Sequence, residues 1–75
     1  MTITAEECGE LTQACCKILR HDIDPKRIKD LLEEAGDVQC MIDLLIKNKF
    51  FTRKQIRDRV KTKQNKMRKR HGDFF

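Results

Sequence analysis

The sequence of 75 residues is poor in the residue types that break helices or stack on bases. It has no tryptophan or tyrosine, one proline and three glycines. A fold of many strands needs more turn-forming residues than this, and it needs apolar and polar positions to alternate. Because the sequence shows neither feature, such a fold is disfavoured. A glycine-rich phosphate loop is absent, and no apolar run reaches the ~18 residues of a membrane helix. The first residues carry acids where a signal peptide is basic and apolar, so we expect a cytoplasmic protein without a membrane partner.

The four cysteines do not form a zinc or redox motif. They stand at positions 8, 15, 16 and 40, with no C-x-x-C spacing and no histidines at zinc-finger distances. We therefore expect reduced thiols that act as small core residues. A chain this short can form only a marginal core without disulfides or a metal, so we expect a homo-oligomer of helices.

The formal net charge of +5 hides an opposition between the two parts of the chain. Residues 1–45 contain five basic and ten acidic side chains, whereas residues 46–75 contain twelve basic and two acidic ones. The first part could hold cations and the second could hold phosphates. The chain length also leaves room for one small domain only, which we expect to span residues 1–75.

Three stretches carry helix-start signals followed by apolar residues at helical spacing. An aspartate N-cap precedes proline at residues 24–25, and capping boxes fit residues 52–55 and, with Thr4 as cap and Glu7 as partner, the start of the chain. The predicted helices are 4–20, 24–48 and 52–70, followed by a flexible tail at 71–75. Their short connections favour an antiparallel helical hairpin. The fold class expected is thus all-α, a three-helix chain that assembles into a multi-helix bundle.

Two pairs of acids lie beside the apolar positions of the first two predicted helices. Glu7 and Glu10 are three residues apart, as are Glu34 and Asp37, so each pair shares a helix face. Four carboxylates that converge must be protonated, turned outward or neutralised by cations. Oxygen ligands of this kind suit Mg²⁺ or Mn²⁺. From spacing alone, solvent-facing acids remain the alternative.

The two acidic motifs resemble those of the MazG-like, all-alpha nucleoside triphosphate pyrophosphohydrolases. Residues 6–11, EECGEL, resemble the family's Glu-Glu-x-x-Glu motif, and residues 34–38, EAGDV, resemble its Glu-x-x-Asp motif. The motifs stand in the family's order with a helix break between them. The resemblance implies hydrolysis of a ribo- or deoxyribonucleoside triphosphate between its α- and β-phosphates, which yields a monophosphate and pyrophosphate. It also implies assembly as a homodimer or homotetramer.

The resemblance assigns roles to particular side chains. The implied ligands of Mg²⁺ or Mn²⁺ are Glu7, Glu10, Glu34 and Asp37. As catalytic residues, Glu6 or Glu10 would accept the proton of the attacking water. The implied phosphate contacts on the basic helix are Lys63, Lys66 and Arg70. A chain this compact would suit a phage-type member that acts in the host cytoplasm.

Two other functions use different parts of the same sequence. A small nucleic-acid-binding protein would use the basic residues after position 46, although these lack the interleaved aromatic residues of single-strand binders. An inactive relative of the family would regulate a partner through its helical surface. Pyrophosphate release from a nucleotide separates the enzyme from both alternatives.

Overall fold

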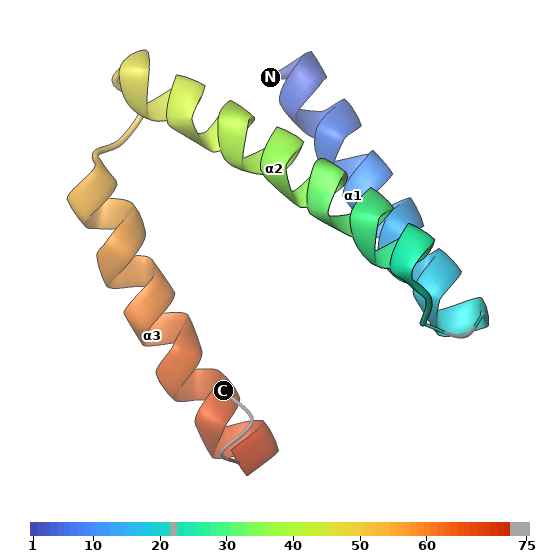
Figure 1. Ribbon diagram of the computed structural model, residues 1–75. Helices are drawn as coiled ribbons and strands as arrows, with labels where there is room; N and C mark the ends of the chain where they lie inside the picture. Colours follow the sequence, from blue (N-terminus) through green and yellow to red (C-terminus); the bar gives the residue numbers. More distant parts are fainter. Residues whose placement is uncertain (22, 73–75) are drawn as a thin grey trace. The chain divides into compact units, whose positions relative to one another are not determined.

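The computed structural model describes residues 1–21 and 23–72. All regular structure in these residues is helical, in α1 (Thr2–Arg20), α2 (Pro25–Lys47) and α3 (Arg53–His71) (Figure 1). The prediction of an all-α chain with three helices is confirmed, and each predicted boundary lies within two residues of the observed one. Among the described helices, none combines the length and apolar character needed to cross a membrane.

The starts of α2 and α3 use the side chains that the sequence indicated. The backbone N–H of Arg27 donates to Asp24 Oδ1 at 2.8 Å, and the Arg27 guanidinium donates to Asp24 Oδ2 at 2.6 Å. At α3, the N–H of Gln55 donates to Thr52 Oγ1 at 3.1 Å, while the N–H of Thr52 donates to Gln55 Oε1 at 2.8 Å. These bonds satisfy N–H groups that a helix start otherwise leaves without a partner.

The predicted capping box at the start of α1 is wrong. The helix begins at Thr2, Met1 is its N-cap, and no side chain caps it. The backbone N–H of Ala5 donates to the carbonyl of Met1 at 3.0 Å, so the helical bonds begin upstream of Thr4. Glu7 therefore lies within the helix, and its carboxylate is available for contacts with α2.

The first two residues of the predicted tail, 71 and 72, belong to the end of α3. His71 is the last residue of α3, and Gly72 follows it with φ of 73°, a conformation that glycine adopts readily. The N–H of Gly72 donates to the carbonyl of Arg68, as is usual for a helix end. The rest of the predicted tail, residues 73–75, lies outside the described residues.

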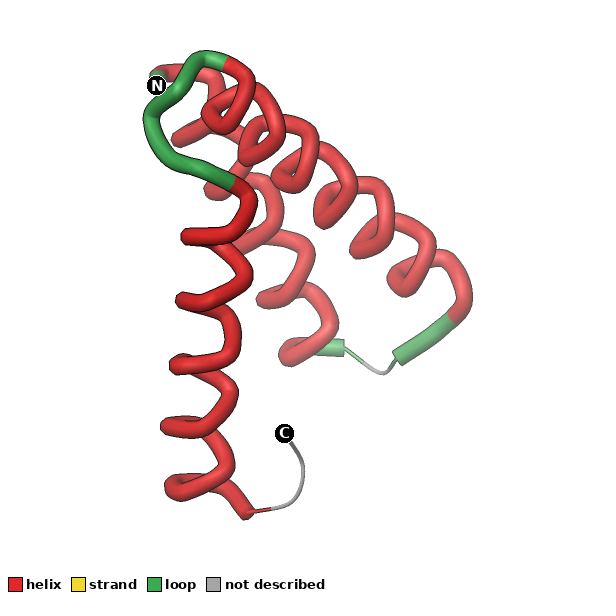
Figure 2. The backbone as a smooth tube through the Cα atoms, turned by 90° about the vertical axis from the view of Figure 1, so that its left-hand side faces the viewer, coloured by secondary structure: helices red, strands yellow, loops and turns green. Residues whose placement is uncertain are grey.

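The chain divides into two compact units, Met1–Leu45 and Ile46–Phe75. This boundary coincides with the change from a net negative to a net positive sequence. In the first unit, α1 and α2 lie side by side in both views (Figures 1 and 2). The second unit contains α3 and the turn before it.

The core of the first unit is very small. Ala14, 8% exposed, is the one buried side chain among the described residues. Half-buried side chains recur every three or four residues on the facing sides of the two helices, at Thr4, Glu7, Leu11 and Ile18 on α1 and at Leu31, Glu34, Val38, Met41 and Leu45 on α2. Two acids thus occupy positions of the inter-helix contact that apolar residues would otherwise fill.

An apolar face of the first unit remains open to solvent. Leu19 is 85% exposed, Leu32 71% and Ile28 46%. Helical spacing places them in one surface that carries no charged side chain, which we call the apolar face: Cys8, Cys15 and Leu19 on α1, with Ile28, Leu32 and Ala35 on α2. The expectation that the cysteines are core residues is wrong for the single chain, because all four are free and exposed. At Cys8 and Cys15, the helix side that bears the thiol is not covered by the other helix of the first unit.

Candidate metal centre

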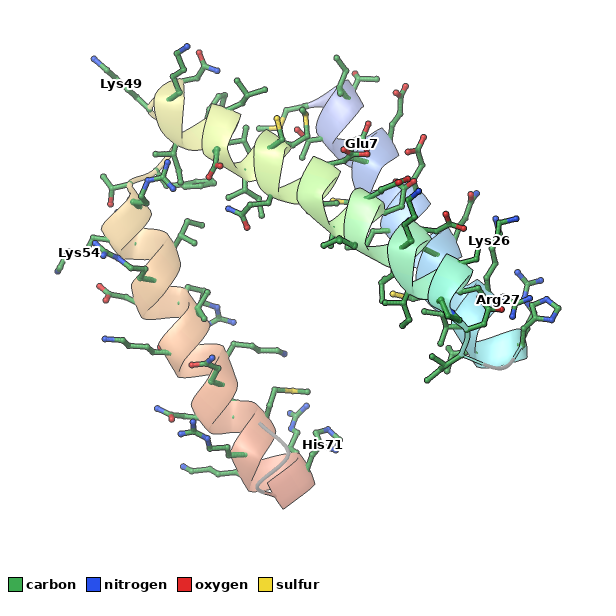
Figure 3. All side chains as sticks on the ribbon, viewed as in Figure 1. Glu7, Lys26, Arg27, Lys49, Lys54 and His71 are labelled. Atoms are coloured by element: carbon green, nitrogen blue, oxygen red, sulfur yellow. The ribbon has the colours of Figure 1, made fainter. Side chains whose placement is uncertain are left out.

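Four carboxylates converge between the two helices of the first unit. One oxygen from each of Glu7, Glu10, Glu34 and Asp37 lies within 4.8 Å of the others. Figure 3 shows Glu7 between α1 and α2. The structure therefore brings together the four side chains that the two sequence motifs supplied, which we call the acidic cluster.

Two members of the acidic cluster are partly removed from water. Glu7 and Glu34 are half-buried, whereas Glu10 and Asp37 are exposed. The Oε2 atoms of Glu7 and Glu34 are buried and have no hydrogen-bond partner. A buried polar atom without a partner is costly, because it has lost its water and gained no replacement.

Burial and mutual repulsion act on these carboxyl groups in the same direction. Desolvation is the main cause that raises the pKa of Glu7, and the charges of Glu10, Asp37 and Glu6 add to it. Desolvation is also the main cause that raises the pKa of Glu34, followed by a hydrogen bond with the Glu10 side chain and by the neighbouring charges. The metal-free acidic cluster therefore resists full ionisation and would be relieved by a cation.

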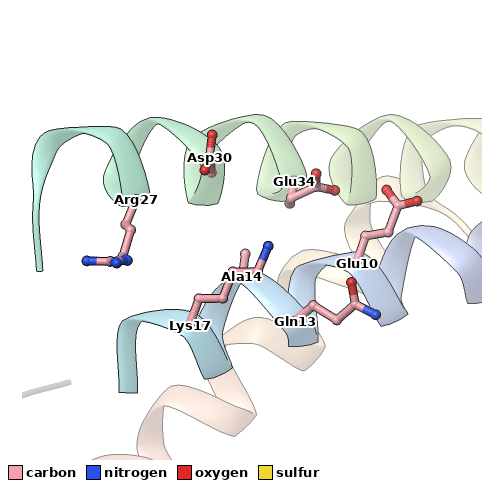
Figure 4. A pocket seen from close by; sticks show the side chains of 7 residues that line it. All are labelled: Glu10, Gln13, Ala14, Lys17, Arg27, Asp30 and Glu34. Atoms are coloured by element: carbon pink, nitrogen blue, oxygen red, sulfur yellow. The ribbon is translucent and has the colours of Figure 1, made fainter. Parts of the chain in front are cut away.

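A pocket of about 370 Å³ adjoins the acidic cluster (Figure 4). The carboxylates of Glu10 and Glu34 lie at one end, the guanidinium of Arg27 lies at the other, and the ammonium of Lys17 lies between them. The remaining lining residues are Gln13, Ala14 and Asp30. The pocket thus presents both acids for a cation and bases for an anion.

The sequence interpretation did not assign a role to Lys17 or Arg27. The available signal was spacing, because Lys17 follows Glu10 by seven residues and Arg27 precedes Glu34 by seven. Seven residues are close to two helical turns, so each base shares a face with an acid of the cluster. Arg27 is already paired with Asp24, which leaves Lys17 as the better placed cation.

The other predicted site residues lie outside the acidic cluster. Glu6 is exposed on α1 next to Glu7, and it is not one of the four converging acids. The predicted phosphate contacts Lys63, Lys66 and Arg70 are exposed on α3, in the second unit. The roles assigned to these four residues stay predictions.

The donor set of the acidic cluster consists of carboxylate oxygens alone. Such ligands select hard divalent cations over metals that prefer sulfur or imidazole. Comparison of the chain with protein-family models, with curated proteins and with solved structures finds no match. A functional assignment therefore depends on the two acidic motifs and on the geometry that brings them together.

Proposed function

We propose that this chain is a MazG-like, metal-dependent nucleoside triphosphate pyrophosphohydrolase. It would hydrolyse a ribo- or deoxyribonucleoside triphosphate between the α- and β-phosphates, and would release a monophosphate and pyrophosphate. One observation carries the proposal: the two motifs of the resemblance, which are far apart in sequence, place four carboxylate oxygens within 4.8 Å of one another. The activity would belong to the cytoplasm, where nucleoside triphosphates are found.

The residues of the acidic cluster fit a divalent cation. Glu7, Glu10, Glu34 and Asp37 would hold Mg²⁺ or Mn²⁺, and the buried Oε2 atoms of Glu7 and Glu34 would gain the partner that they lack. When bound, such a cation lowers the pKa of water and offsets the charge of phosphate.

The remaining chemistry belongs to side chains around the pocket. Glu10 lies in both the acidic cluster and the pocket, so its carboxylate, or that of Glu6, would accept the proton of the attacking water. Lys17 would donate to a phosphate oxygen from within the pocket. The resemblance also implies phosphate contacts from Lys63, Lys66 and Arg70, which belong to the second unit.

Assembly is the second part of the proposal. We propose that α1 and α2 form an antiparallel hairpin and that the apolar faces of two hairpins pack together, as a homodimer or as half of a homotetramer. The exposed Leu19 and Leu32, together with a core of one buried alanine, support this arrangement. A two-helix layer buries too little apolar area to be stable alone, and a matching copy would convert it into a four-helix bundle.

A pyrophosphate-release screen tests the enzymatic proposal. Canonical and modified nucleoside triphosphates are incubated with the full chain, with Mg²⁺ and Mn²⁺ in separate runs. We expect release from at least one nucleotide, a loss of at least 100-fold in kcat for Glu10→Gln and for Asp37→Asn, and wild-type rates for Glu33→Gln, an exposed acid of α2 outside the acidic cluster. If the chain binds metal but releases pyrophosphate from none of the nucleotides, the enzymatic proposal is refuted. The chain would then be an inactive relative of the family.

A further inference from the structure

The second unit carries a concentration of positive charge that a triphosphate does not account for. Ten lysines and arginines lie in α3, a helix of 19 residues, against one acid, Asp58. Asp58 pairs with Lys54 at 3.7 Å, but both side chains are more than 60% exposed, so the pair neutralises little of the charge. A small substrate with three phosphates would meet only a few of these cations.

The cations of α3 are arranged in two rows. Four of them follow steps of four, three and four residues, and we call them the first row: Arg59, Lys63, Lys66 and Arg70. Four others follow steps of three, four and seven residues, and form the second row: Lys54, Arg57, Lys61 and Arg68. All eight are exposed. At 3.6 residues per turn the two rows fall on opposite sides of the helix.

The two sides between the rows differ in character. One bears Ile56, Val60 and Met67, of which Ile56 and Met67 are half-buried. The opposite side bears exposed residues that can donate to or accept from base edges, namely Gln55, Thr62, Asn65 and Lys69, together with the one acid of the helix, Asp58. Around its axis, α3 therefore shows an apolar side, a cationic row, a polar side and a second cationic row.

This arrangement matches one class of polyanion. The major groove of B-form DNA is about 12 Å wide and admits an α-helix of 10–12 Å diameter, with a phosphate backbone along each wall. We propose that α3 binds double-stranded DNA in the major groove, with one cationic row on each backbone and the polar side toward the base edges. Single strands fit less well, because no aromatic residue between Arg53 and His71 can stack on a base. The deep, narrow major groove of duplex RNA excludes the helix.

The test measures how salt affects binding of the full chain to a labelled 20-base-pair DNA duplex by fluorescence anisotropy. Six to eight phosphate contacts predict a slope of log K against log [KCl] of about −5 to −7. Neutralising either row, as R59Q/K63Q/K66Q/R70Q or as K54Q/R57Q/K61Q/R68Q, is expected to make the slope shallower by about 3–4. The matched control K17Q/R20Q/K26Q/K29Q removes the same charge from the first unit and should leave the slope within about 1 of the wild-type value.

Two further variants separate DNA binding from folding and from hydrolysis. Asp58→Asn removes the only acid of α3 and should bind the duplex about two- to fivefold more tightly, with unchanged helix content. The variant E7Q/E10Q/E34Q/D37N should keep DNA binding while it loses any hydrolysis. The circular dichroism of each variant at 222 nm reports its helix content.

Several results would overturn the proposal. One is the absence of duplex binding at 50 mM KCl. Another is that a single strand or a duplex RNA of the same sequence binds as tightly as the duplex DNA. A third is that phosphatidylserine vesicles bind more tightly than the duplex DNA at equal salt. If neutralising only one of the two rows weakens binding, the DNA contacts one side of the helix. If the first-unit control makes the salt slope shallower by the same amount, net charge alone attracts the DNA. Either result contradicts a helix held between two backbones.

Discussion

Replacement of Leu32 by glutamate tests whether the chain self-associates or is a monomer. In the single chain Leu32 is 71% exposed, so a glutamate at this position should change the stability of the first unit little. In the proposed assembly the same side chain lies against a second copy, and the substitution places an unpaired charge in an apolar contact. A monomeric chain should therefore tolerate this substitution, whereas an assembled chain should dissociate.

The size of the effect follows from the exposed area that association would cover. Full burial of a leucine side chain is worth about 1.5–3 kcal/mol, and most of the Leu32 side chain is still available for burial. In a two-fold symmetric dimer the change occurs twice, which gives about 3–6 kcal/mol. At about 1.4 kcal/mol per tenfold change, the dissociation constant should rise about 10²- to 10⁴-fold.

Sedimentation equilibrium over a range of protein concentrations measures this change directly. Leu44→Glu serves as the matched control, because Leu44 is a 42% exposed leucine of the same helix that lies outside the apolar face. We expect a concentration-dependent dimer or tetramer for the wild type and for Leu44→Glu, and a monomer with lower helix content for Leu32→Glu. A wild-type chain that stays monomeric and fully helical at 100 μM would refute the assembly.

Other consequences of the structure can be checked in stability measurements. Because the pKa values of Glu7 and Glu34 are raised above 4.5 in the fold, the folded protein binds protons more tightly than the unfolded one. In EDTA, the contribution of these groups should be fully present below pH 4.5 and lost as the pH rises through their raised pKa values. The free energy of unfolding, measured by urea titration, should therefore depend on pH differently for wild type and for E7Q/E34Q across this range. The same pH dependence for both proteins would show that Glu7 and Glu34 are not desolvated in the fold. Asp24→Ala removes the cap that Arg27 uses, and should cost about 1 kcal/mol, or 4–8 °C in Tm by differential scanning calorimetry. Thr52→Ala breaks the capping box of α3 and should lower the ellipticity at 222 nm, whereas an unchanged spectrum would mean that the box does not limit fraying.

The starts of α2 and α3 could be predicted because they are decided locally. An aspartate before a proline, and a threonine three residues before a glutamine, satisfy N–H groups within four residues of sequence. The start of α1 could not be predicted in the same way. Thr4 had the right partner at Glu7, yet the helical bonds continue upstream to Met1 and the Glu7 carboxylate lies in the contact with α2. A local capping signal fails where the helix extends past it, because its residues then lie inside the helix.

The acidic cluster could be predicted in part, for a related reason. A spacing of three residues places Glu7 with Glu10, and Glu34 with Asp37, on the same helix faces, and the resemblance joins the two pairs. Spacing does not reveal that two of the acids are half-buried with unpartnered oxygens, because burial depends on how the two helices pack. Helical periodicity likewise identifies an apolar face but does not tell whether the chain itself or a second copy covers it.

The central claim is that the acidic cluster binds a divalent cation, and titration calorimetry of Mn²⁺ into metal-free protein tests it most directly. The most informative comparison is between Glu34→Gln and Glu33→Gln, which remove the same charge from adjacent positions of α2, one within the acidic cluster and one outside it. We predict that wild type and Glu33→Gln bind Mn²⁺ with the same affinity and that Glu34→Gln binds at least tenfold more weakly. Equal affinities for the two variants, or no heat of binding to the wild type, would contradict the account.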